Sequence, residues 1–136
     1  MNKLTITFAV LICVFVFCLQ ASVVNADDEI SFSRDIRLIL SDKCFACHGP
    51  EEKSREGGIR FDQQASAFGE ADSGEHPIVP SNPKESELVT RITSAEDGIQ
   101  MPPAESNKPL TPLEIDLLTK WIASGAEWED HWAFIP

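Results

Sequence analysis

The stretch Cys44-Phe45-Ala46-Cys47-His48-Gly49 decides how this chain folds, because it predicts a large group bound covalently inside the domain. It is a C-x-x-C-H motif, in which two thiols are followed directly by an imidazole. Thiols at this spacing can add to the two vinyl groups of one haem, and the adjoining histidine can bind its iron. The motif therefore predicts one c-type haem per chain, attached through Cys44 and Cys47, with His48 as the proximal iron ligand.

Two other readings of the cysteine pair compete with haem attachment. Cys44 and Cys47 could form a short disulfide or a redox dithiol, but thioredoxin-like dithiols follow a strand, and here a helical pattern precedes the pair. A closed zinc site needs four ligands, and only His76 and His131 remain as nitrogen donors beside His48. The haem reading is favoured over both.

The N-terminus has the form of a secretory signal. Lys3 precedes a mostly apolar run at residues 4–19, and Val24-Asn25-Ala26 has the small-x-small pattern of a cleavage site. An uncleaved membrane anchor is the alternative, although the run is short for a membrane span. We expect a signal peptide at residues 1–26, contact with the membrane only during export, and a periplasmic or otherwise exported protein. Cys13 and Cys18 would leave with the signal.

The chain is strongly acidic, with 22 Asp and Glu against 11 Lys and Arg and a formal net charge of −11. Nucleic acid binding needs a basic face, so this balance argues against it. An acidic surface suits electrostatic pairing with a basic redox partner, and it equally suits simple solubility.

Hydrophobic periodicity predicts an all-α fold. The haem domain is expected at residues 27–128, with residues 129–136 as a tail or the start of a linker to a missing domain. Three main helices are expected at about 33–43, 83–93 and 112–124, with a short fourth from Asp62 to about Phe68. The second begins at a predicted capping box of Asn82 and Glu85, and the third at one of Thr111 and Glu114. The long loops between them would be ordered around the haem.

The sixth iron ligand is predicted to be Met101. It is the sole methionine after the signal, and Pro102 and Pro103 stiffen the loop that carries it. His76, His131 or an open position are the alternatives. Two supporting roles are also expected: Arg60 would bind a haem propionate, and the carbonyl of Pro50 would accept the second N–H of His48.

The ordered succession of several segments resembles the planctomycete-type c-type cytochrome domain. These segments are SFSRDIRLILSDKCFACHGP at 31–50, GGIRFDQQASA at 57–67, IVPSNPKESELVTRI at 78–92, MPP at 101–103, LTPLEIDLLTKWIASGAEW at 110–128 and HWAF at 131–134. The resemblance implies a small class I-like cytochrome c fold with His48 and Met101 as axial ligands. It also implies that Trp121 lies in the C-terminal helix against the haem region.

In that family the domain usually heads a longer exported protein, and HWAF marks the junction to the next domain. The expected function is electron transfer, either to an attached C-terminal domain or to a separate redox partner protein. A haem enzyme module, such as a peroxidase or an oxidoreductase subunit, is the first alternative. It is disfavoured because no residue stands out as an acid–base partner for peroxide cleavage. A disulfide-stapled, non-haem interaction domain is the second.

Overall fold

The structure is a computed structural model, and it describes residues 29–129. This part of the chain is helical and contains no strand, as predicted. The first helix opens with a π-helical turn, η1 (Phe32–Ile36), and continues as α2 (Arg37–Lys43). Its start is fixed by Ser31, whose hydroxyl accepts from the Arg34 amide, while the Asp35 carboxylate accepts from the Ser31 amide. The predicted helix at 33–43 is therefore confirmed.

The last helix is also close to its predicted bounds. The helix α6 (Pro112–Ala123) begins with the predicted capping box, in which Thr111 and Glu114 satisfy each other's backbone amides. It ends before Gly125, which has a φ of +116°. Glycine reaches that conformation without a steric penalty, so it terminates the helix as expected.

The start of the middle helix was predicted wrongly. A 3₁₀ turn, η3 (Pro83–Glu85), is followed by a separate helix, α5 (Glu87–Thr93), and Asn82 makes no side-chain cap. Ser86 divides the two, since its backbone is extended and its buried hydroxyl accepts from the Val79 amide and donates to the Asn82 carbonyl. That hydroxyl holds the chain entering α5, a role that helical periodicity does not reveal.

The remaining elements are short. They are α3 (Phe45–His48), the 3₁₀ turns η2 (Glu52–Ser54) and η4 (Ala104–Ser106), and α4 (Gln64–Ala67). Asp62 does not cap α4 as predicted, because its carboxylate binds Arg60 instead.

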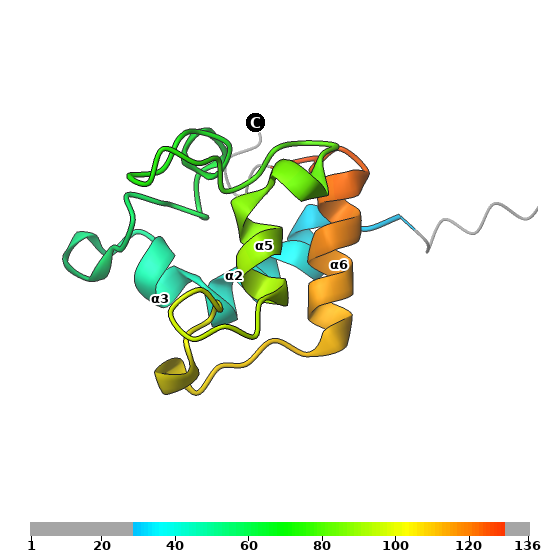
Figure 1. The fold of residues 1–136 in the computed structure, drawn as a ribbon. Coiled ribbons are helices and arrows are strands. Elements are labelled where there is room, and N and C mark those ends of the chain that lie inside the picture. The colour runs from blue at the N-terminus through cyan, green and yellow to red at the C-terminus, as the bar shows by residue number, and fades with distance from the viewer. Residues whose placement is uncertain (1–28, 130–136) are drawn as a thin grey trace, which may run out of the picture.

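The core forms where η1–α2, α5 and α6 meet, and Figure 1 shows α5 beside α6 with α3 at the far side of the molecule from α6. Its largest buried side chains include Phe32, Ile36 and Leu40 from the first helix and Leu118, Trp121 and Ile122 from α6. The centroid of the Phe32 ring lies 5.6 Å from the ring centroid of Trp121 and 4.1 Å from that of Trp128. Leu113, in the first turn of α6, is 66% exposed.

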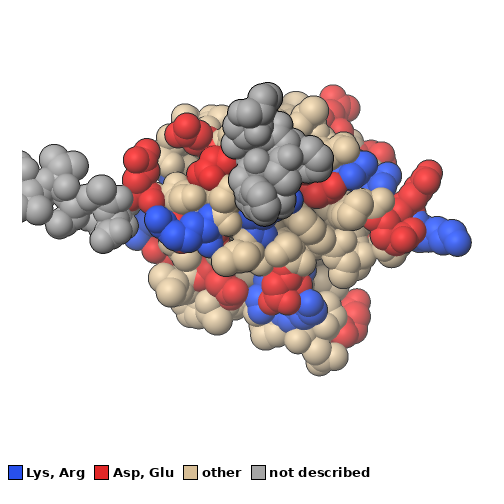
Figure 2. All heavy atoms as spheres, turned by 180° about the vertical axis from the view of Figure 1, so that it is seen from behind, with Lys and Arg blue, Asp and Glu red and all other residues tan. Residues whose placement is uncertain are grey.

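Charges on the surface are mixed. Figure 2 shows acidic and basic side chains interspersed over one face of the molecule. Among residues 29–129, no helix combines the length and the apolar character needed to cross a membrane.

Candidate haem-attachment site

Cys44, Cys47 and His48 lie on a single helical turn. Cys44 joins α2 to α3, and its carbonyl accepts from the amides of Cys47 at 3.1 Å and His48 at 2.8 Å. Residues three and four apart in a helix share one side, so both thiols and the imidazole project together. The spacing predicted from the motif is thus realised as one compact turn.

The two thiols differ in environment. Cys44 is buried and Cys47 is exposed, and they are not joined in a disulfide. Burial, with a smaller contribution from the charges of Asp42 and Cys47, raises the pKa of Cys44 to about 12. Among residues 29–129, no group of three or more His, Cys, Asp and Glu side chains could hold a metal ion.

The ring of His48 is oriented by a backbone carbonyl. Its Nδ1 lies 3.1 Å from the Glu56 carbonyl oxygen, which can only accept, so Nδ1 donates and Nε2 keeps its lone pair. The prediction that Pro50 supplies this carbonyl was wrong. The Pro50 carbonyl instead accepts from Nη2 of Arg55 at 3.0 Å, because the chain turns after Gly49 and returns beside α3 only at residues 54–56.

Electrostatics keep His48 in the form that binds metals. Burial lowers the pKa of the imidazole, the charge of Arg91 lowers it further, and the bond to Glu56 opposes both. A lowered pKa favours neutral imidazole at neutral pH, which is the ligand form of histidine.

The loop that carries Met101 is tied to the neighbourhood of the motif at both ends. The Met101 amide donates to the carbonyl of Arg91, the residue in α5 whose charge acts on His48. Near the other end, Nζ of Lys108 donates to the carbonyl of Asp42 at 2.6 Å and to its carboxylate at 2.9 Å. Asp42 lies in the last turn of α2, just before Cys44. This loop, yellow in Figure 1, runs from α5 to α6 and leaves Met101 half-buried.

The other predicted site residues have local partners. Arg60 binds the Asp62 carboxylate through Nε at 3.1 Å and Nη2 at 2.5 Å. His76 is exposed, and its Nδ1 donates to the carbonyl of Phe68 at 3.2 Å. His131 lies outside the described residues. Trp121 is in α6 as predicted, and its indole N–H donates to the Glu127 carbonyl.

These residues fit a covalently attached haem. The thiols are unpaired, and the tautomer fixed by Glu56 directs an imidazole lone pair away from its backbone partner. Sequence reasoning missed Arg55 and Glu56. Arg55 acts through a guanidinium that spans a turn, and Glu56 acts through its backbone carbonyl. No residue pattern marks such a carbonyl in advance.

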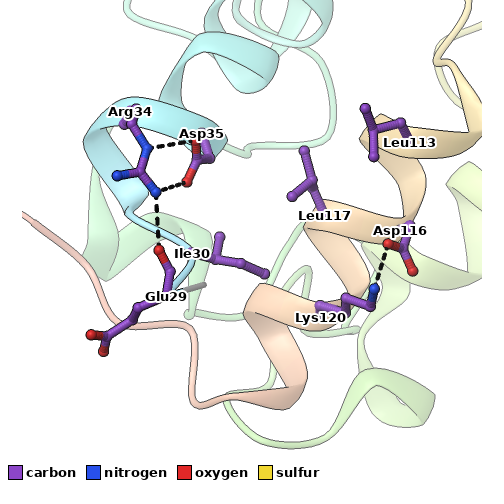
Figure 3. Close-up of a pocket in the computed structure, with 8 residues that line it drawn as sticks. All are labelled: Glu29, Ile30, Arg34, Asp35, Leu113, Asp116, Leu117 and Lys120. Atoms are coloured by element: carbon purple, nitrogen blue, oxygen red, sulfur yellow. Dashed lines mark hydrogen bonds and ion pairs between the residues drawn. The ribbon is translucent and has the colours of Figure 1, made fainter. Parts of the chain in front are cut away.

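A shallow groove lies elsewhere on the molecule, between the start of the first helix and α6. Figure 3 shows Ile30 and Leu117 facing each other across it, with the pairs Arg34–Asp35 and Asp116–Lys120 at its edges. None of its lining residues belongs to the cysteine–histidine turn or to the Met101 loop. The groove is therefore separate from the candidate site. The thiols of Cys44 and Cys47 and the imidazole of His48 locate that site by their chemistry.

Comparison with protein-family models gives the family of this part of the chain. A family model described as Planctomycete cytochrome C matches residues 44–105, from the first cysteine of the motif to just beyond Met101. No match was found among curated proteins or among solved structures.

Proposed function

Residues 44–105 of this chain belong to the planctomycete cytochrome C family, and on that premise we propose that the protein transfers electrons on a single haem attached to Cys44 and Cys47. A cytochrome c domain implies haem, and with it haem-based electron transfer. The observation that carries the proposal is the turn itself: two thiols and an oriented imidazole share one side of α3.

His48 and Met101 are the proposed axial ligands. A bound haem supplies a one-electron couple, and histidine–methionine ligation raises its potential. His48 would present Nε2, since Nδ1 is committed to Glu56. Met101 is supported by the two ties of its loop, at Arg91 and at Asp42. A filled sixth position favours electron transfer over chemistry that needs open access to iron.

Arg60 is proposed as a propionate partner. Its fork already binds one carboxylate, that of Asp62, through two nitrogens. The same planar geometry suits a second carboxylate. If a propionate replaced the Asp62 carboxylate at the guanidinium, or shared the guanidinium with it, Arg60 would neutralise part of the negative charge of the haem.

We also propose that the protein is exported and works with redox partners. The apolar run at 4–19 and the Val24-Asn25-Ala26 pattern support export to the periplasm or beyond. The electron donor and acceptor would be one-electron redox proteins, one of which could be an attached C-terminal domain. Exported protein should begin at Asp27, which N-terminal sequencing of the periplasmic fraction tests.

Covalent attachment is tested by export of the full chain in a host that matures c-type cytochromes. The expected product carries one haem by mass and gives a c-type pyridine haemochrome spectrum. The paired variant Cys44→Ala/Cys47→Ala should lose both signals. A haem-free product with Cys44 and Cys47 oxidised would instead establish the disulfide-stapled alternative.

The sixth ligand is tested by Met101→Ala, with His76→Ala as the matched control. The methionine variant should lose the methionine–iron absorption band near the red end of the spectrum and fall in reduction potential, while the histidine variant keeps both. A wild-type protein with five-coordinate, high-spin iron that binds CO rapidly would favour the haem enzyme alternative.

A further inference from the structure

The backbone after the cysteines is held by an unbroken series of hydrogen bonds. Each carbonyl of residues 46–50 accepts one bond from the segment 54–61. In order, the donors are the Ser54 hydroxyl at 3.0 Å, the Glu56 amide at 2.8 Å, the Phe61 amide at 2.8 Å, Nε of Arg55 at 3.2 Å and Nη2 of Arg55 at 3.0 Å. The last carbonyls of a helix ordinarily lack partners, so this segment supplies them.

Arg55 is the only side chain in this series that binds two carbonyls. Its guanidinium spans Gly49 and Pro50, the two residues at which the chain leaves α3. A planar fork with several donors can satisfy two adjacent acceptors at once, whereas the ammonium of lysine is a single point. Arg55 is half-buried and so partly shielded from competing water.

The next residue in the chain is the one that orients His48. The Glu56 amide donates to Cys47 and its carbonyl accepts from Nδ1 of His48, so Glu56 binds the turn twice. Because residues 55 and 56 are adjacent, the Arg55 fork fixes the position from which the Glu56 carbonyl meets the imidazole. Such partners set the ring orientation and the basicity of a metal-binding histidine.

We propose that Arg55 is a positioning residue for the haem iron: its bonds to Gly49 and Pro50 hold the Glu56 carbonyl against His48. The inference rests on the proposed function, since it assigns the group that tunes the proximal ligand. Loss of the fork frees the loop, weakens the Nδ1–H bond and makes the imidazole a poorer donor. The oxidised iron then loses more stabilisation than the reduced iron, and the reduction potential rises.

The test compares Arg55→Gln with Lys53→Gln in the haem-loaded full chain. Lys53 is exposed, lies in the same turn, and its side chain makes no hydrogen bond or ion pair within residues 29–129. Both variants remove one positive charge, so any difference between them reports on the hydrogen bonds of the Arg55 guanidinium. Exchange of the Glu56 amide, followed in the reduced protein, should be at least about tenfold faster in Arg55→Gln than in the control. The reduction potential should rise in Arg55→Gln relative to the control.

The outcomes separate this inference from the proposed function. Wild-type protein without covalent haem, seen first in the haemochrome spectrum, would overturn both. A haem-loaded wild type in which the two variants agree in exchange and potential would overturn the role of Arg55 alone. If Arg55→Gln fails to load haem, Arg55→Lys takes its place, and a lysine variant equal to wild type in both measurements overturns the role.

Discussion

The backbone amide of Phe32 donates a hydrogen bond to the carboxylate of Glu129 at 3.1 Å, which joins the first helix to the last described residue of the chain. The hydroxyl of Ser31 donates to the same oxygen at 3.0 Å. Glu129 therefore supplies an acceptor to a backbone amide at the start of a helix, which a local capping residue usually does.

Glu129→Ala is expected to lower the free energy of unfolding by about 1 kcal/mol, the usual cost of losing a helix cap. The control is Glu127→Ala, since Glu127 is exposed and only its carbonyl is used, by Trp121. Urea unfolding of the haem-loaded protein measures both variants. Equal midpoints for the two would show that the contact between Phe32 and Glu129 contributes nothing.

The contribution of Glu129 should also depend on pH. The hydroxyl of Ser33, followed by that of Ser31, donates to the carboxylate and lowers its pKa in the folded state. The unfolded chain then binds the proton more readily, so stability from this group is present above its ordinary pKa and is lost as pH falls through the lowered value. The difference in unfolding midpoint between wild type and Glu129→Ala should be largest near pH 7 and shrink below about pH 4. A difference that stays constant or widens in acid would contradict this assignment.

Gly49 has no room for a side chain. A Cβ at this position would clash with the Phe45 carbonyl oxygen and lie 2.9 Å from the Phe45 Cβ, and Gly49 is itself buried. Gly49→Ala should therefore shift the chain between α3 and Arg55 and destabilise the protein by about 1–3 kcal/mol, as overpacking does. The yield of haem-loaded protein should fall with it.

Gly74→Ala is the comparison for that substitution. Gly74 has a φ of +84°, but an added Cβ would lie in open space, so only backbone strain of about 1 kcal/mol is expected. Thermal unfolding ranks the two variants. A larger loss at Gly74 than at Gly49 would show that the chain after the haem motif tolerates a side chain.

Ser86 should matter more than a typical serine. Its hydroxyl is fully buried and is the partner of the Val79 amide at 2.9 Å and of the Asn82 carbonyl at 2.9 Å. Ser86→Ala leaves both groups without that partner, at a cost of about 1–3 kcal/mol. Ser41→Ala, at an exposed helix position, should change the free energy of unfolding by less than about 0.5 kcal/mol. Equal effects at the two serines would contradict the assigned role.

Ser86 and Thr111 together show what the sequence could predict. The bounds of α6 followed from a local device, the capping box of Thr111 and Glu114, and from hydrophobic spacing. The start of α5 offered the same signals at Asn82 and Glu85, yet Ser86 broke the helix through a bond to Val79. Local patterns thus held where local bonds decide the conformation, and failed where a contact from outside the helix decided it.

The same distinction applies at the candidate site. The residue types and spacing of Cys44, Cys47 and His48 are written in the motif, and one helical turn brings them together. The partner of His48 was misplaced at Pro50 because a carbonyl is common to every residue. Glu56 is the partner of His48 because of the path that the chain takes through the turn after Gly49.

Lys108 should help to keep Met101 at the iron. Its ammonium binds the carbonyl and carboxylate of Asp42 and so ties the methionine loop to the end of α2. Lys108→Gln weakens that tie, so a larger share of molecules should lose the methionine–iron absorption band on heating. The effect at room temperature should be small, since both side chains are about half exposed and exposed ion pairs contribute little.

The matched control for Lys108 is Lys84→Gln, an exposed lysine in η3 that removes the same charge. The absorption band is followed against temperature in low salt and again at about 1 M salt, where the Debye length is about 3 Å. Wild type should approach Lys108→Gln as salt rises, because screening weakens the pair that the variant lacks, while Lys84→Gln should follow wild type throughout. If both lysine variants lost the band at the same temperature, the contact with Asp42 would have no part in holding Met101, and the loop would be fixed by the bond from its own amide to Arg91.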